Sequence, residues 1–282
     1  MEIFLIILAL VYLVYASISD LKKREIPNWL SFSLIVFALA YRAFISAINL
    51  DLWYFIFGLL GLGVFVALGY GFYYARIFAG GDAKLLMAFG AVLPVSGFYS
   101  SLISSFAFIF LILFCGSIYG IIWSFYLILG NWKNFSSEFL KQAGKNKKLF
   151  YFSLALAVIL IFLPVYSHDW ILALIPVIFF LFPLLFIFAK AVEESCMIID
   201  VKTSKLTEGD WLYEKVKIGR KTIKPYWEGL SLEEIKILRK YKGKVKIKQG
   251  IPFVPAFFFA FVVLIYLYLT NSSVLNILGI FF

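Results

Sequence analysis

The sequence predicts an all-α polytopic membrane protein of six to eight transmembrane helices, with a small cytosolic α+β segment. Two observations lead to this class. Of the 282 residues, 63% are hydrophobic, and the mean hydropathy is +0.96, values that soluble globular domains do not reach. Several apolar runs also have the ~20 residues that a helix needs to cross a bilayer.

Eight apolar runs are candidate spans. The first lacks the basic region and the small-residue cleavage site of a signal peptide, so we interpret it as a retained helix. The fourth is short and contains Pro94, and the fifth is long enough to tilt or bend near Gly116 and Gly120. The runs cover residues 2–19, 29–49, 52–75, 85–99, 101–129, 149–166, 170–190 and 252–270.

The charged residues predict how these spans are oriented. If the spans alternate in direction, all the basic loops fall on one side, and the opposite loops carry Asp51, His168 and Asp169 but no Lys or Arg. Cytosolic loops are enriched in Lys and Arg. We therefore expect a multi-pass protein of the cell membrane with its N-terminus outside. The net charge of +10 then reflects membrane orientation and not nucleic-acid binding. Arg42 lies inside the second span, and we expect its side chain to snorkel to the outer interface.

One sizeable polar region stands out, at residues 191–250. From Lys190 to Lys248 the chain has fifteen basic and nine acidic residues, a net charge of +6. A basic domain of this kind is expected to lie against anionic lipid headgroups. The sequence thus divides into a transmembrane catalytic core at 1–190, a small basic cytosolic domain at 191–250, and a C-terminal transmembrane helix with its tail at 251–282.

Secondary structure inside the polar region is also predictable. Short strands are expected at Met197–Val201 and Tyr213–Ile218, and a helix from Leu232 to about Tyr241. Ser231 and Glu234 have the spacing of a capping box at the start of that helix. The two cysteines, Cys115 and Cys196, give neither a disulfide framework nor the spacing of a metal site.

Two carboxylates, Asp20 and Asp82, follow spans at the predicted cytosolic face. Acidic residues beside hydrocarbon are costly to bury, so each is a functional candidate by default. Together they can form a paired-carboxylate catalytic site. The structural alternatives are a solvated Asp20 that neutralises the nearby basic residues, and an Asp82 that merely belongs to a turn between two spans.

The residues around the two aspartates narrow these alternatives. Pro27 and Asn28 restart a helix soon after Asp20, with Asn28 as the expected N-cap, so the short loop holds Asp20 on a rigid helix end. Gly80 and Gly81 precede Asp82. They either supply the positive φ of a turn or let an extended peptide backbone approach closely. Lys84 either snorkels to headgroups or favours ionised Asp82.

These residues resemble a known family. Asp20 with Ile26-Pro27-Asn28, and Gly81-Asp82 with Lys84-Leu85, resemble the two acidic motifs of the type IV prepilin peptidases, membrane aspartic proteases of the GxGD class. The resemblance covers roughly residues 1–90 and is closest to the archaeal preflagellin (archaellin) and prepilin peptidases. Two later runs are similar to the C-terminal portion of that branch: Glu208–Leu212 and Gly250–Phe257.

The sequence departs from the family pattern in two ways. Ala79 stands where the GxGD motif has its first glycine, which weakens the motif. Bacterial members often carry a cytosolic cysteine tetrad and also N-methylate their product. Here only Cys196 is expected on the cytosolic side, so the sequence supports neither zinc binding nor methyl transfer.

The resemblance implies an aspartic endopeptidase with Asp20 and Asp82 as its catalytic dyad. It acts at the cytosolic face without a metal or a cofactor. Its substrates would be preflagellin-like or prepilin-like precursors with a short basic leader, and the choice between these two classes stays open. Its other partners would be membrane lipids. Five further residues would shape the site or bind substrate: Gly80, Gly81, Lys84, Pro27 and Asn28.

Other functions remain open from the residues alone. One is a presenilin-like aspartic protease that cuts inside the bilayer, for which the two aspartates would face each other deep within helices. A second is a transporter that uses Asp20 and Asp82 as ion ligands, although coupling sites usually lie near the midplane. A third is a non-catalytic assembly protein, which would tolerate loss of both carboxylates.

Overall fold

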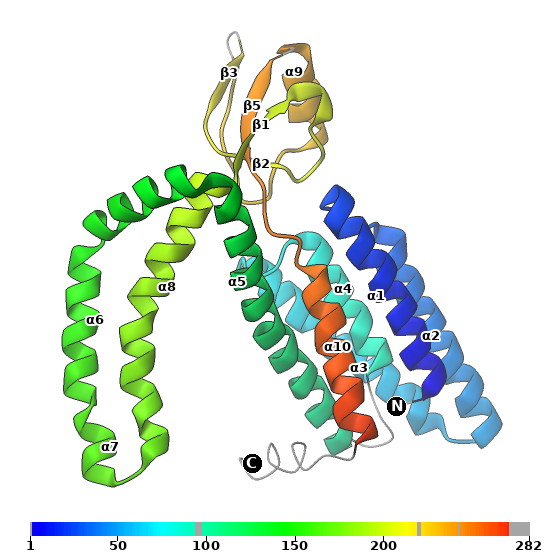
Figure 1. The fold of residues 1–282 in the computed structure, drawn as a ribbon. Helices are drawn as coiled ribbons and strands as arrows, with labels where there is room; N and C mark the ends of the chain where they lie inside the picture. Colours follow the sequence, from blue (N-terminus) through cyan, green and yellow to red (C-terminus); the bar gives the residue numbers. More distant parts are fainter. Residues whose placement is uncertain (1, 94–97, 219–220, 242, 271–282) are drawn as a thin grey trace. The chain divides into compact units, whose positions relative to one another are not determined.

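The computed structural model describes residues 2–93, 98–218, 221–241 and 243–270. It is mostly helical, with six helices long and apolar enough to cross a membrane and a small region of short strands, which confirms the predicted fold class. The chain forms two compact units, which we call unit 1 (Met1–Ile121 with Ile251–Phe282) and unit 2 (Ile122–Gly250). Figure 1 shows the elements of both units along the chain. The predicted domain limits at 190 and 250 stay a prediction.

Unit 1 is a bundle of helices joined by short connections. Asp51 caps the third helix by accepting a hydrogen bond from the Trp53 backbone N–H at 3.1 Å, and Arg24 and Leu50 end the first two helices in the left-handed conformation. The unit comprises α1 (Ile3–Lys23), α2 (Asn28–Asn49), α3 (Leu52–Tyr74), α4 (Gly80–Val92), the first part of α5 (Phe98–Lys145) and α10 (Val254–Leu269).

Several predicted boundaries of these helices need correction. α4 begins at Gly80 and not at residue 85, so Asp82 lies in its first turn. The predicted end of that span at 94–97, with Pro94, lies outside the described residues, as does the tail from 271 onward. α5 does not break at its glycines, because its non-helical residue is Asn131. Gly116 instead makes room for a ring, since a Cβ there would lie 2.4 Å from the Phe253 Cζ.

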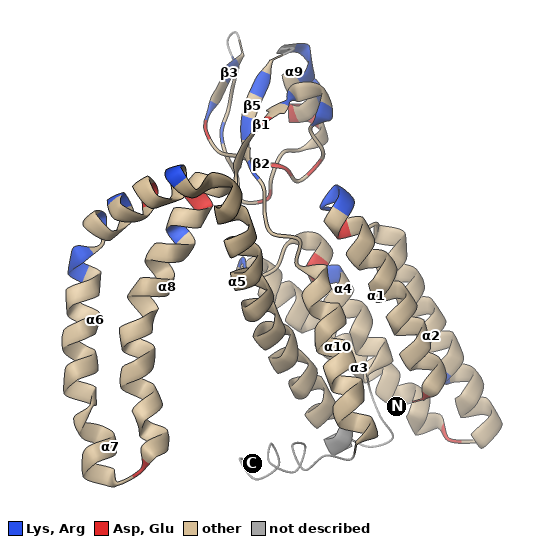
Figure 2. Cartoon of the chain, in the orientation of Figure 1, with Lys and Arg blue, Asp and Glu red and all other residues tan. Residues whose placement is uncertain are grey.

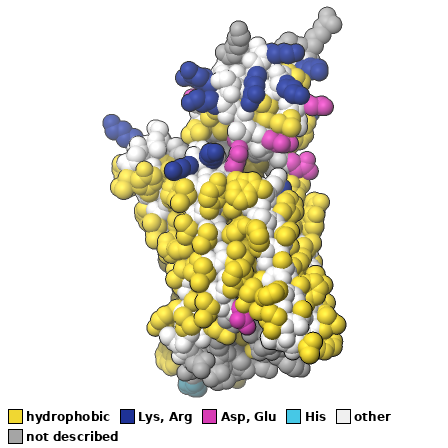
Figure 3. Space-filling view, turned by 90° about the vertical axis from the view of Figure 1, so that its right-hand side faces the viewer, with side chains coloured by type: hydrophobic (Ala, Val, Ile, Leu, Met, Phe, Trp, Pro, Cys, Tyr) yellow, Lys and Arg dark blue, Asp and Glu magenta, His cyan; other side chains and the backbone are white. Residues whose placement is uncertain are grey.

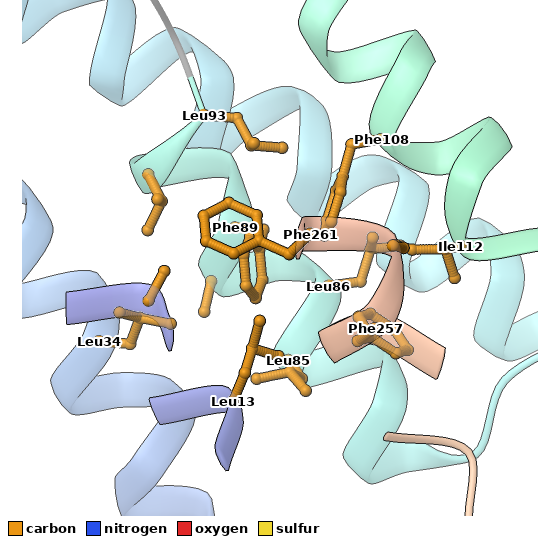
Figure 4. Packing of buried hydrophobic residues seen from close by; sticks show 14 of the residues in the cluster. Leu13, Leu34, Leu85, Leu86, Phe89, Leu93, Phe108, Ile112, Phe257 and Phe261 are labelled. Atoms are coloured by element: carbon orange, nitrogen blue, oxygen red, sulfur yellow. The ribbon is translucent and has the colours of Figure 1, made fainter. Parts of the chain in front are cut away.

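The core of unit 1 is built from apolar side chains of six helices, including Phe65 of α3. Figure 4 shows rings and aliphatic side chains from α1, α2, α4, α5 and α10 pointing toward one another. Phe89 packs against Phe108 at 4.8 Å and against Phe261 at 5.3 Å between ring centroids. Lipid is as apolar as these side chains, so close van der Waals packing is what holds such helices together.

Glycines let α3 and α4 approach closely. A Cβ on Gly90 would come within 2.6 Å of the Gly61 carbonyl oxygen, and one on Gly69 within 2.6 Å of the Met87 Cγ. Small residues at a helix interface are typical of membrane bundles. α4 is therefore held along its length, which fixes the first turn that carries Asp82.

Arg42 does not snorkel to the interface as predicted. It is 1% exposed, and its guanidinium donates to the backbone oxygens of Ala91 at 2.7 Å and Val92 at 3.0 Å. These carbonyls belong to the last turn of α4, where no backbone N–H of the same helix is available to donate to them. Arg42 also donates to the Tyr54 carbonyl oxygen at 3.3 Å, and its guanidinium carbon lies 4.7 Å from the centre of the Tyr54 ring. The arginine thus ties α2, α3 and α4 together.

Unit 2 contains further apolar helices and the strands. Its helical part consists of the rest of α5, α6 (Lys147–Leu160), α7 (Phe162–Ser167), η1 (Trp170–Ala173) and α8 (Leu174–Cys196). Its strand-bearing part consists of β1 (Ile198–Lys202), η2 (Thr203–Lys205), β2 (Trp211–Leu212), β3 (Val216–Ile218), β4 (Lys221–Ile223), α9 (Leu232–Tyr241) and β5 (Lys244–Lys248). β5 pairs antiparallel with β1 and with β2, and β3 pairs antiparallel with β4.

The strand-bearing part agrees well with the sequence. The strand predicted at Met197–Val201 is β1, shifted by one residue. Of the strand predicted at Tyr213–Ile218, only the second half is present, as β3, because residues 213–215 are not extended into a strand. The predicted helix is α9. Its capping box is present, because the Ser231 N–H donates to the Glu234 carboxylate at 3.0 Å and the Glu234 N–H donates to the Ser231 hydroxyl at 3.3 Å.

The surfaces of the two kinds of structure differ. Figure 3 shows the helical surface in view covered with hydrophobic side chains, whereas Lys and Arg gather over the strand-bearing part. Along α1, for example, Ile7 is 56% exposed and Val11 is 61% exposed. Water disfavours an apolar surface of this extent, and the hydrocarbon of a bilayer covers it without cost.

Candidate active site

Asp20 lies in the last turn of α1, and its side chain is buried, with 7% exposed. Its carboxylate accepts a hydrogen bond from the Val254 backbone N–H, with Oδ2 and N 3.0 Å apart. Val254 is the first residue of α10, so its N–H is one of the donors that a helix start leaves without a helical partner. The start of α10 therefore fixes the carboxylate of Asp20.

The chain folds back immediately after Asp20. The Arg24 N–H donates to the Asp20 backbone oxygen at 2.9 Å, and Arg24 has the left-handed φ of 58°. The Ser19 hydroxyl donates to the Glu25 carbonyl oxygen at 2.8 Å. The connection from α1 to α2 is thus a tight turn, as predicted, and it orders the helix end that carries Asp20.

Asp82 is the third residue of α4, which begins after Ala79. The Ala79 backbone N–H hydrogen-bonds to the carboxyl group of Asp82. The positive end of the helix dipole also stabilises a negative charge at this position. Asp82 is therefore held by the helix start itself and not by a flexible turn.

The two motifs that surround the aspartates meet in space. A Cβ on Gly81 would lie 3.3 Å from the Ile26 Cβ, so the glycine lets the α1–α2 turn lie against the first turn of α4. The Lys84 ammonium donates to the Asn28 side-chain oxygen at 2.8 Å, which joins α4 to α2. Figure 2 shows charged residues at the same, upper ends of α1 and α4.

These contacts correct three details of the sequence interpretation. Gly80 and Gly81 are helical and do not have positive φ, whereas Arg76 in the preceding turn has a φ of 61°. Pro27 occupies the N-cap position of α2 and accepts from the Leu30 N–H at 3.0 Å. Asn28 is the first helical residue, so its side chain is available to Lys84 and does not cap the helix.

The electrostatics of the pair suit acid–base chemistry. The pKa of Asp82 is raised from 3.8 to about 7. Burial is the largest cause, the negative charge of Asp20 adds to it, and the hydrogen bond from the Ala79 N–H opposes both. With a pKa of about 7, this carboxyl group keeps its proton in about half of the molecules at pH 7. Two close carboxyl groups that share one proton present one protonated and one ionised group. The site can thus present one proton donor and one proton acceptor together.

Two residues near Asp20, Val254 and Tyr119, were not predicted, whereas Arg24 is one of the basic residues that the sequence places beside it. Besides Val254, the Arg24 guanidinium and the Tyr119 hydroxyl group of α5 interact electrostatically with Asp20. Tyr119 and Val254 lie far from Asp20 in the sequence, and no local pattern marks them. One indication for α10 was present in the sequence: the run Gly250–Phe257 resembles the C-terminal portion of the archaeal peptidases. That resemblance did not assign a role to Val254.

The chain is also similar in sequence to known proteins. Residues 7–130 match the Type IV leader peptidase family, a range that includes both aspartates. The chain is 40% identical over 82 residues to the preflagellin peptidase of Methanocaldococcus jannaschii, which is 29% of this chain and 35% of that relative. It is 36% identical over 103 residues to the prepilin peptidase EppA of Methanothermobacter thermautotrophicus, which is 36% of this chain and 26% of that relative.

The matched regions are partial. The chain spans about a third of the length of the first relative and about a quarter of the second. No solved structure gives a significant match.

Proposed function

We propose that this chain, whose residues 7–130 match the Type IV leader peptidase family, is a membrane aspartic endopeptidase with Asp20 and Asp82 as its catalytic pair. The observation that supports this most strongly is the convergence of the two acidic motifs. Gly81 packs on Ile26, and Lys84 binds Asn28, so the helix ends that carry the two carboxylates are joined. Neither contact would be needed for two independent surface loops.

The proposed mechanism uses the two carboxyl groups in different states. The ionised carboxylate takes a proton from a water molecule, which attacks the scissile carbonyl carbon, while the protonated carboxyl group donates to the carbonyl oxygen. The raised pKa of Asp82 favours its role as the donor. Asp20, which accepts the Val254 N–H, is then the base. Collapse of the tetrahedral intermediate releases the amine of the new N-terminus after a proton returns to it.

We propose that the substrate is a preflagellin-like or prepilin-like precursor and that cleavage occurs at the cytosolic face. The two aspartates lie near ends of α1 and α4 that carry Lys22, Lys23 and Lys84, and basic residues favour the cytosolic side. A basic leader would stay in the cytosol there, while the apolar segment behind it enters the bilayer. The site at the helix ends favours this reading over a presenilin-like cut within the bilayer.

A cleavage assay tests the proposal. The full chain is purified in detergent, mixed with a precursor that has a Lys- or Arg-rich leader, and the products are identified by mass spectrometry. Removal of the leader by the wild type, and not by Asp82→Asn, is the expected result. Folded protein that cleaves none of several archaellin-type and pilin-type precursors would favour the transporter or assembly alternatives.

The pH dependence of cleavage follows from the raised pKa of Asp82. Because its pKa is about 7, the proton that the mechanism requires is lost as the pH rises through this value. We expect kcat/KM to fall about tenfold per pH unit well above pH 7, measured from pH 5 to 9 at constant ionic strength. A rate that stays constant up to pH 9 would contradict the assignment of Asp82 as the donor.

The contact between α10 and Asp20 gives a separate prediction. Val254→Pro removes one of the two backbone N–H groups, those of Val254 and Phe253, that hydrogen-bond to Asp20. Proline is tolerated at a first helical position. A hydrogen bond to a charged group contributes about 1.5–3 kcal/mol. We therefore expect kcat to fall roughly 10-fold or more, with KM little changed, because the proline displaces a catalytic group and not the substrate.

The control for this variant is Val254→Ala, which trims the side chain but keeps the N–H. It should retain most of the wild-type kcat, and both variants should be compared as folded protein, judged by thermal unfolding in detergent. Equal losses of kcat in the two variants would show that packing of the valine, and not its N–H, matters at this position.

A further inference from the structure

We propose that the strand-bearing part of unit 2 contains a binding site for a phosphate group, separate from the proposed peptidase site. The site is a hollow of about 400 Å³ where the end of β1, η2, the end of α9 and the start of β5 come together. It is lined by Lys202, Thr203, Ser204, Arg239, Gly243 and Lys244.

The two lysines of this hollow stand at an unfavourable place in the sheet. Lys202 of β1 is the direct cross-strand partner of Lys244 of β5. Like charges directly opposite each other destabilise an antiparallel pair. At the pair two positions further along the same strands, Asp200 lies opposite Lys246, and these two residues carry opposite charges. The like-charged pair is thus an exception within its own ladder, and it lies at the hollow.

Neither lysine of the pair is neutralised within the described residues. The salt bridges there involve other lysines, including Lys246 with Glu214 at 3.8 Å. An anion in the hollow would neutralise both ammonium groups at once and turn their repulsion into attraction. This is the physical reason to expect a bound anion and not merely a basic surface.

The other lining groups supply directed donors. The Arg239 guanidinium is anchored because it donates to the Leu206 carbonyl oxygen at 3.2 Å. The Thr203 N–H donates to the Gly243 carbonyl oxygen at 3.0 Å, which fixes the two backbone edges of the hollow. Ser204 adds an exposed hydroxyl group. Figure 2 shows Lys and Arg concentrated on β5 and α9.

Three cations and a hydroxyl group suit a phosphate better than a carboxylate. Arginine binds phosphate oxygens through two parallel N–H donors, and lysine binds them as a point charge. A single carboxylate charge would leave most of the positive charge uncompensated. The phosphate can come from the headgroup of an anionic lipid or from a soluble phosphate compound, since both present the same oxygens.

The test uses the full chain in a neutral detergent and measures the midpoint of thermal unfolding. One arm adds inorganic phosphate, with chloride at matched ionic strength as its reference. The other arm adds mixed micelles of phosphatidylglycerol, with phosphatidylcholine micelles as the reference. A ligand that binds only the folded chain raises the midpoint in a concentration-dependent way, which gives an apparent Kd in each arm.

The decisive variants are Lys202→Gln with Lys244→Gln, compared with Lys217→Gln and Lys221→Gln. The second pair removes the same charge from exposed positions on β3 and β4. We expect the first pair to weaken binding at least about tenfold and the second less than about twofold. Without ligand, the first pair should unfold at a higher temperature than the wild type, because the cross-strand repulsion is gone.

The two arms distinguish the sources of the phosphate. Stabilisation by phosphatidylglycerol alone identifies a lipid headgroup, and stabilisation by inorganic phosphate identifies a soluble compound; either supports the site if the Lys202 and Lys244 variant abolishes it. Stabilisation in neither arm, or an equal loss in both double variants, would overturn the proposal. The outcome is independent of cleavage, so a failed peptidase assay leaves this test unaffected.

Discussion

Replacing either Asp20 or Asp82 by asparagine is expected to reduce cleavage of a prepilin-like precursor by at least about a thousandfold. Asparagine keeps the size of the side chain and can accept the same hydrogen bonds, from Val254 at position 20 and from Ala79 at position 82. It can neither take up a proton from water nor pass one to the scissile carbonyl. The loss is measured as kcat/KM on one precursor with a Lys-rich leader.

Because the two carboxyl groups act as a unit, the losses of cleavage activity caused by the two substitutions should not add. The double variant is expected to be about as slow as either single variant, since removing one partner already removes the chemistry. Asp51→Asn is the matched control: it lies in the same unit, and asparagine caps a helix as well as aspartate does. Near wild-type cleavage by either single variant would refute the assignment of the pair.

Asp82→Asn should abolish cleavage and yet raise the stability of the folded chain above neutral pH. The pKa of Asp82 is 3.8 in its ordinary state and about 7 in the folded chain, so ionisation at rising pH favours the unfolded chain. The wild type therefore loses stability as the pH rises from about 4 to 7, at up to about 1.4 kcal/mol per pH unit. Asp82→Asn lacks this loss, so it should unfold at a higher temperature than the wild type at pH 8.

The sequence alone predicts the parts of this structure that depend on local patterns. The apolar runs predict the membrane helices, because length and hydropathy are sufficient to identify a span. Ser231 and Glu234 predict the start of α9, since a capping box depends on residues three apart. The acidic motifs identify Asp20 and Asp82 as candidates in the same way.

Contacts between distant residues are what the sequence does not reveal. Asp20 and Val254 are 234 positions apart and yet form a hydrogen bond. Nothing in the run Val254-Pro255-Ala256 indicates that its first N–H binds a carboxylate. Gly81 illustrates the same limit. From the sequence it either has positive φ or makes room for a peptide backbone, whereas in the structure it is helical and makes room for the Ile26 side chain.

Arg42 is the clearest case in which a local rule gives the wrong answer. An arginine near the end of a span usually reaches toward the interface. Here the carbonyl groups at the end of α4 are buried nearby, and the guanidinium can bind two of them at once. Gly58 of α3 leaves the space for this, because a Cβ there would lie 2.5 Å from the Arg42 Cδ. No pattern within α2 reports either feature.

Replacing Arg42 by methionine is therefore expected to destabilise the folded chain by about 3 kcal/mol or more. Methionine fills part of the space, but the carbonyl oxygens of Ala91, Val92 and Tyr54 lose their donors, and each buried group without a partner costs about 1–3 kcal/mol. The favourable interaction of a cation with the negative end of the α4 dipole is lost as well. The change is measured as a lower midpoint of thermal unfolding in detergent.

Two further variants separate the role of the planar set of N–H donors of Arg42 from the role of its charge. Arg42→Lys keeps the charge but not the planar set of donors, so its midpoint should lie between those of the wild type and Arg42→Met. Lys23→Met removes an exposed cation from α1 and should change the midpoint little. α4 carries Asp82 in its first turn and meets Arg42 at Ala91 and Val92 in its last turn, about 15 Å away along the helix axis. Cleavage by the Arg42 variants should therefore decline only as far as the folded fraction does. A loss of kcat in fully folded Arg42→Lys would instead mean that Arg42 adjusts the position of α4 within the folded state.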